Sequence, residues 1–173
     1  MNRTQRYVRF KTLVGFEGVF SQQWDNEAFG YVEVEALRKQ KAAKYVTEIT
    51  PDNSAKWIGF IKDCAAKKSN DWATFPIFSE FLLLLGEKKP NIAFKAIATG
   101  DEGVLNFLPS LLAGLSKSAD QKGYKTLVGE YTVAGKHLAE ITRQYRFSDM
   151  VRVADIREVL LSAIKARDEL AIT

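Results

Sequence analysis

The segment from Gly129 to His137 comes nearest in this chain to a motif that could do chemistry. In a phosphate-binding loop, backbone amides and a lysine after the second glycine hold the phosphates, and a Ser or Thr follows that lysine to bind magnesium. Here five residues separate Gly129 from Gly135, where the motif has four, and His137 replaces the hydroxyl residue. The segment also lies inside a helical pattern and not after a strand, so we do not expect nucleotide binding there.

Nucleophilic and metal chemistry lack the residues that they need. His137 is the single histidine and Cys64 the single cysteine, and they lie far apart in the sequence. They cannot form a zinc-type cluster, and no serine lies in a nucleophile-elbow motif that could use His137 as a base. Neighbouring carboxylates are one or two positions apart, so they diverge on a helix. The sequence therefore predicts no catalytic residue, no metal ligand and no cofactor.

A group of cations at the start of the chain stands out from the other charges: Arg3, Arg6, Arg9 and Lys11. The formal net charge is +4, and without these four residues the chain has 21 basic and 21 acidic side chains. On a helix, cations at steps of three fan out over a broad face, which can contact phosphates without reading a base sequence. We expect these four residues to be the contact if a partner is bound electrostatically.

The composition favours an all-α protein with one domain over residues 1–173. Nearly half of the residues are apolar, enough for a sizeable core, and only four are proline. The longest apolar run, Phe81 to Leu85, is far too short for a membrane span, so we expect no membrane partner. A lone Cys64 and the lack of a secretory signal favour a cytoplasmic location.

Apolar residues at steps of three and four predict about eight antiparallel helices, stacked as hairpins in a short solenoid or an irregular bundle. Besides the N-terminal segment, the predicted helices cover residues 26–50, 52–67, 76–85, 91–99, 101–115, 120–146 and 148–171. Gly86 is expected to end the third of these, and Pro109 to kink or break the helix over 101–115.

Three of these helices have an apolar face that the spacing defines. The helix over 120–146 is expected to carry one continuous seam, weakened by two glycines. The three faces comprise Phe29, Val32, Ala36, Ala43 and Val46 in 26–50; Leu127, Tyr131, Ala134, Leu138, Ile141 and Tyr145 in 120–146; and Val153, Ile156, Leu160, Ile164 and Leu170 in the last helix, which Ser148 is expected to cap.

Two short segments within residues 10–38 are similar in sequence to two segments within residues 124–157, and we call this similarity the internal echo. FKTLVG at 10–15 recurs as YKTLVG at 124–129, an offset of 114 residues. YVEVEALR at 31–38 resembles MVRVADIR at 150–157, an offset of 119, and the order of the two echoes is preserved. Each copy predicts a helix, a turn and a second helix. Because the second copy stops early, we predict that the chain is a piece of a longer helical-repeat protein.

With repeated hairpins, the chain resembles α-helical repeat proteins of the HEAT, armadillo and tetratricopeptide kinds, although it carries no consensus motif of any of them. The resemblance implies a solenoid in which hairpins share a continuous core, and it implies no activity. The echo spacing is also much longer than the roughly 34 to 47 residues of those repeats.

Two functions fit this interpretation of the sequence. The first is a non-catalytic scaffold that binds protein partners or another part of a larger chain. The alternative is a nucleic-acid-binding helical-repeat module that uses the basic face formed by Arg3, Arg6, Arg9 and Lys11, with binding that weakens as salt rises.

Overall fold

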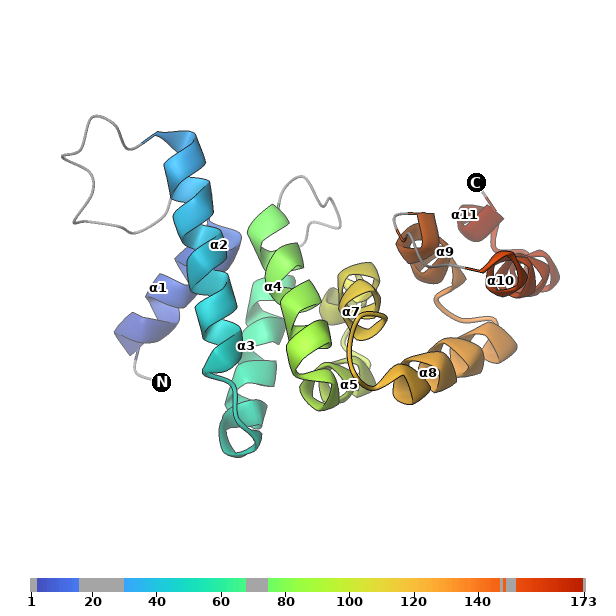
Figure 1. Ribbon diagram of the computed structural model, residues 1–173, viewed down its shortest axis with the longest axis horizontal. Helices are drawn as coiled ribbons and strands as arrows, with labels where there is room; N and C mark the ends of the chain where they lie inside the picture. Colours follow the sequence, from blue (N-terminus) through green and yellow to red (C-terminus); the bar gives the residue numbers. More distant parts are fainter. Residues whose placement is uncertain (1–2, 16–29, 68–74, 147, 149–151, 173) are drawn as a thin grey trace.

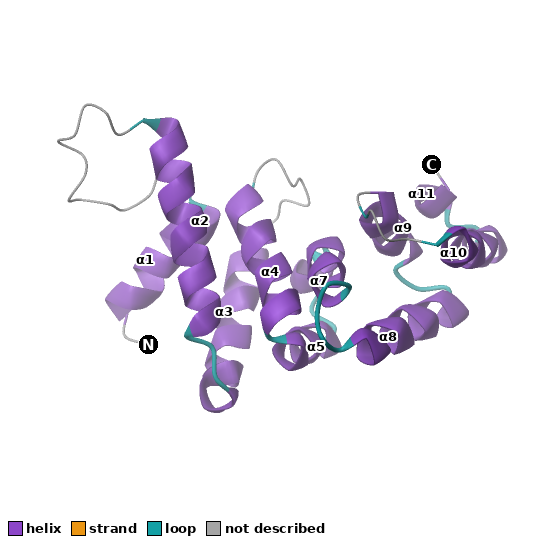
Figure 2. Ribbon diagram, in the orientation of Figure 1, coloured by secondary structure: helices purple, strands orange, loops and turns teal. Residues whose placement is uncertain are grey.

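The computed structural model describes residues 3–15, 30–67, 75–146, 148 and 152–172. All regular structure in these residues is helical, which confirms the all-α prediction (Figures 1 and 2). The helices are α1 Arg3–Val14, α2 Tyr31–Thr47, η1 Pro51–Asn53, α3 Ser54–Ala65, α4 Pro76–Lys88, α5 Pro90–Ala98, α6 Glu102–Leu105, α7 Leu108–Leu115, α8 Gln121–Ala134, α9 Leu138–Arg146, α10 Val153–Ala166 and α11 Glu169–Ile172. None of these helices is long and apolar enough to cross a membrane.

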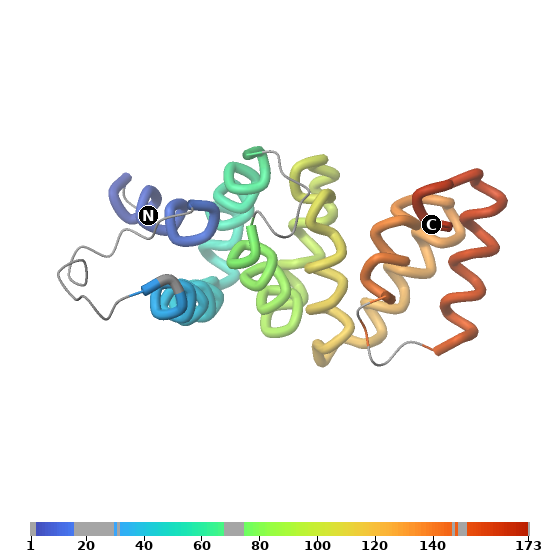
Figure 3. Tube along the Cα trace, turned by 90° about the horizontal axis from the view of Figure 1, so that it is seen from above, coloured from blue at the N-terminus to red at the C-terminus, as the bar shows by residue number. Residues whose placement is uncertain are grey.

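The helices follow one another along an elongated array, with α1 and α10 at opposite ends (Figures 1 and 3). In one row α2 packs against α4, α4 against α7 and α7 against α9. In a second row α1 packs against α3, and α3 against α5. Elements that are near in the sequence are therefore near in space, which is the arrangement that short connections favour.

Contacts of α1 define the directions of the first three helices. Arg9 of α1 pairs with Glu48 at the end of α2, whereas Thr12, further along α1, accepts a hydrogen bond from Arg38, earlier in α2. These two helices are therefore antiparallel. Arg6 pairs with Asp63 of α3, and Lys67, just after α3, lies over the ring of Phe10, so α1 and α3 run in the same direction.

The core is densest between α4 and α7, where two glycines let the backbones touch. A Cβ atom on Gly86 would lie 2.6 Å from the carbonyl oxygen of Leu111, and one on Gly114 would lie 2.9 Å from the amide nitrogen of Glu87. Gly86 was expected to end its helix, and this prediction is wrong, since α4 continues to Lys88. The glycine serves close packing and not termination.

The apolar face predicted for the first long helix is also wrong in part. Val32 is 72% exposed, and Ala36 and Ala43 are exposed as well. The buried positions of α2 are instead Arg38, Ala42, Tyr45 and Val46, so only the last residue of the predicted face is correct. Phe29 lies outside the described residues.

Three predicted helices are each divided in two, which accounts for eleven α-helices where about eight were expected. Pro109 lies in the first turn of α7, after α6 has ended, as the sequence indicated. The predicted helix over 120–146 ends at Ala134, because Gly135 adopts a left-handed conformation with φ of 65°. Asp168 then separates α10 from α11. Ser148 is not the cap of α10, whose N-cap residue is Arg152.

The two copies of the first echo have different helical surroundings. Gly15 follows the end of α1, whereas Gly129 lies inside α8. Thr12 is buried, whereas Thr126 is exposed. The idea that the chain belongs to a longer repeat protein stays a prediction.

Candidate protein-interaction surface

The four N-terminal cations do not form a common free surface. Arg6 pairs with Asp63 and lies 5.5 Å from the ring centre of Phe60. Arg9 pairs with Glu48 at 2.5 Å and stacks over two aromatic rings of α2 and α3. Two of the four cations thus hold α1 on its neighbours. Arg3 is exposed and Lys11 is half-buried.

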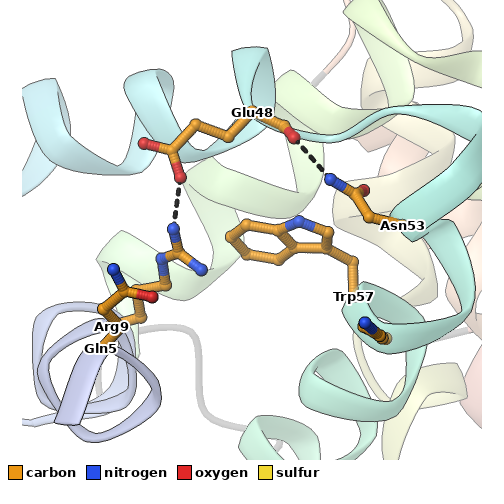
Figure 4. A pocket seen from close by; sticks show the side chains of 6 residues that line it. Gln5, Arg9, Glu48, Asn53 and Trp57 are labelled. Atoms are coloured by element: carbon orange, nitrogen blue, oxygen red, sulfur yellow. Dashed lines mark hydrogen bonds and ion pairs between the residues drawn. The ribbon is translucent and has the colours of Figure 1, made fainter. Parts of the chain in front are cut away.

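A polar pocket of about 290 Å³ lies where α1, the end of α2 and the start of α3 meet (Figure 4). In this pocket the guanidinium of Arg9 lies 4.8 Å from the ring centre of Trp57. The amide of Asn53 donates to the backbone carbonyl of Glu48 at 2.9 Å and its oxygen accepts from the Thr50 amide. These residues form their contacts with one another, so the pocket is a place where three helices are held together.

The glycine–lysine segment around His137 forms the turn between α8 and α9 and has no loop that could cradle a phosphate. His137 has a φ of 54°, and its ring packs edge-on against Tyr131 with a centroid distance of 4.8 Å. Its Nδ1 lies 3.9 Å from a carboxylate oxygen of Glu140. The imidazole is half-buried. Within the described residues, no group of three or more His, Cys, Asp and Glu side chains could hold a metal ion.

A hydrogen-bonded group ties α8 to α9. The hydroxyl of Tyr124 donates to Oε1 of the buried Gln144 at 3.0 Å. Burial, followed by the neighbouring Tyr145 and Asp155, raises the pKa of Tyr124 above its ordinary value. The phenol therefore stays protonated at neutral pH, which suits a structural hydrogen bond and not a general base.

Cys64 lies in the core of α3 with 1% of its surface exposed, and burial raises the pKa of its thiol. Because the thiolate is the reactive form, we expect the native protein to react with a disulfide reagent at pH 8 only as fast as it unfolds. Absorbance at 412 nm should therefore rise at once in guanidinium chloride and remain flat without it. Rapid stoichiometric modification of the folded chain would show that this part of the core is open.

The most unusual surface is the outer side of the last two helices. Nine large apolar residues are exposed among the described residues, and six of them belong to α10 and α11. The six are Val153 (81% exposed), Ile156 (36%), Leu161 (50%), Ile164 (59%), Leu170 (80%) and Ile172 (50%). The other three, Tyr7, Val32 and Val133, lie on three different helices. We call the four of these residues that belong to α10, together with the half-buried Leu160 of the same helix, the end face.

The end face is a second apolar face of a helix that already has one. Val159 and Ala163 of α10 are buried, and Ser162 donates to the backbone carbonyl of Thr132 in α8. Val153, Ile156, Leu160 and Ile164 follow steps of three and four, so they lie along one stripe beside the buried positions, and all but Leu160 are exposed. Figure 3 shows α10 as the outermost helix at this end. The apolar face predicted for the last helix is therefore wrong as a packing face: the buried residues of α10 are Val159 and Ala163, and Leu170 belongs to α11.

Cations border the end face. Arg157 lies within the stripe, four residues after Val153, and Arg167 follows Ile164 by three. Neither forms an ion pair with another described residue, whereas Arg152 is bound to Asp155 at 2.6 Å. The end face is therefore bordered by two positive charges that form no ion pair with any described residue.

Comparisons with known proteins add no relative: no family model matches the chain, and neither a curated protein nor a solved structure is significantly similar to it.

Proposed function

We propose that this chain is a non-catalytic helical scaffold that binds a protein partner through the end face. The observation that carries the proposal is the concentration of exposed apolar side chains on α10 and α11. A helix at the edge of a protein needs one apolar stripe to pack on its core, and a second stripe exposed to water is unfavourable. Exposed apolar patches of this kind are typical of interaction sites.

An affinity isolation with a matched control tests this proposal. The tagged wild type is compared with the double variant Ile156→Glu/Ile164→Glu and with Val133→Glu, which places the same charge on exposed α8. We expect a stoichiometric protein partner that is lost with the double variant and kept with Val133→Glu. A set of bound proteins that is the same for all three chains would contradict the proposal. Circular dichroism checks that each variant is folded.

The hypothesis that the chain binds nucleic acid has less support than the protein scaffold, because Arg6 and Arg9 form contacts within the fold. Replacing them would disturb α1, so the appropriate variant is Arg3→Gln/Lys11→Gln. We expect the wild type to show no tight binding to mixed single- and double-stranded nucleic acid in a fluorescence titration between 50 and 200 mM salt. Tight binding that falls steeply with salt and is lost in the double variant would favour the nucleic-acid function instead.

A further inference from the structure

The second sequence echo relates the solvent-exposed face of α10 to a face of α2 that another helix covers. At the offset of 119 residues, Arg157 corresponds to Arg38, Leu161 to Ala42 and Ile164 to Tyr45. The three residues of α2 are buried, and the three of α10 are exposed. The same offset matches Glu48, the C-cap residue of α2, to Arg167, the C-cap residue of α10.

In α2 this face holds the helix α1. The guanidinium of Arg38 donates to the carbonyl oxygens of Thr12 at 2.8 Å and Gly15 at 2.5 Å, at the C-terminal end of α1. The hydroxyl of Tyr45 lies 3.4 Å from that of Thr12, and Glu48 pairs with Arg9. A cation at the last carbonyls of a helix is favourable, because these carbonyls are unpaired and carry the negative end of the helix dipole.

No described helix takes the corresponding place on α10. The helix α8 carries the first echo, but it packs on the opposite side of α10, where Thr132 meets Ser162 and Gly135 lies beside Ala166. In these two pairs the residue numbers of both partners increase together, so α8 runs parallel to α10. By contrast, α1 runs antiparallel to α2.

We infer that the end face binds one amphipathic helix of a protein partner, antiparallel to α10, with the helix's C-terminal carbonyls at Arg157 and a carboxylate side chain opposite Arg167. This inference rests on the proposed function and specifies its partner. The carboxylate follows from charge complementarity, because Arg167 at the C-cap of α10 forms no ion pair with another described residue. A second copy of the chain fits less well, since two end faces would bring Arg157 and Arg167 of each copy together.

Two labelled peptides test the inference. The first has the sequence of residues 3–15 with Arg9→Glu, and the second is the unchanged sequence. We expect the first peptide to bind the wild-type chain at least tenfold more tightly by fluorescence anisotropy at 50 mM salt. Arg167→Glu should reverse this preference. Arg157→Gln should weaken the first peptide about fivefold or more, Arg157→Lys should weaken it less, and Val133→Glu should leave it unchanged.

Each of the following outcomes would contradict a stated part of the inference. Equal affinity for the two peptides, or no binding of either, overturns the helical partner with a carboxylate, while the proposed function is judged separately by the affinity isolation. Binding that depends on Arg38 and not on Arg157 means that the peptide replaces α1, which also overturns it. A dimer in sedimentation equilibrium that Ile156→Glu/Ile164→Glu abolishes makes a second copy the occupant.

Discussion

Replacing Gly114 with alanine is expected to lower the free energy of unfolding by about 3 kcal/mol, near the upper end for overpacking a core. The added Cβ would overlap the carbonyl oxygen of Leu83 and lie 2.9 Å from the amide nitrogen of Glu87. Both atoms belong to the backbone of α4, so no side chain can move aside. For a chain of this size the melting temperature should fall by about 6–12 °C, measured by circular dichroism.

Gly129→Ala is the matched control, because Gly129 lies inside α8 and its Cβ would meet no atom within 4 Å. Alanine favours the helix there, so we expect stability to rise by about 0.5–1 kcal/mol. If Gly114→Ala were as well tolerated as this control, α4 and α7 would not approach each other as described.

Replacing Arg38 with methionine is expected to cost about 2–4 kcal/mol of the stability of α1, because it removes a charged donor from buried carbonyls. The side chain is 9% exposed and donates to the carbonyl oxygens of Thr12 and Gly15. Since α1 lies at the end of the array, the variant should loosen α1 before the other helices. Hydrogen exchange followed by mass spectrometry should show faster exchange in residues 3–14.

Arg143→Met serves as the control for Arg38→Met, since Arg143 is exposed on α9. We expect it to change stability by less than about 0.5 kcal/mol. Unchanged exchange of α1 in Arg38→Met would mean that the hydrophobic contacts of Leu13 and Val14 are sufficient to hold this helix.

The helical class and most of the core could be predicted from spacing alone. Trp57, Ile61 and Cys64 of α3, and Phe78 and Phe81 of α4, follow steps of three and four along the sequence, and all five are buried. Asp101 and Asp120 are the N-cap residues of α6 and α8, and each accepts a backbone hydrogen bond, as aspartate commonly does at this position.

What the sequence could not provide depends on contacts between helices. A glycine within an apolar run signals either a helix end or close packing, and only the position of Gly114 shows that Gly86 serves the second. A cation every third residue indicates a basic face, but it does not reveal that Asp63 and Glu48 lie opposite two of them.

The exposure of the candidate surface could not be predicted from the sequence for the same reason. Its residues were visible as an apolar stripe, yet a stripe that packs on a core and one that points to solvent have the same spacing. Their difference lies in the neighbouring helices α8, α9 and α11, which pack on α10, where Val159 and Ala163 are buried and Ile156 and Ile164 are exposed.

Site-specific photo-crosslinking from the end face tests the central claim most directly. A photoreactive amino acid replaces Leu161 (50% exposed) in one chain and the more exposed Val133 of α8 (86%) in another, and both are irradiated in the cells that produce the protein. The account predicts a discrete crosslinked product with one protein from position 161 and none from position 133. Identical products from both positions, or none from position 161, would contradict the claim that this face binds a partner.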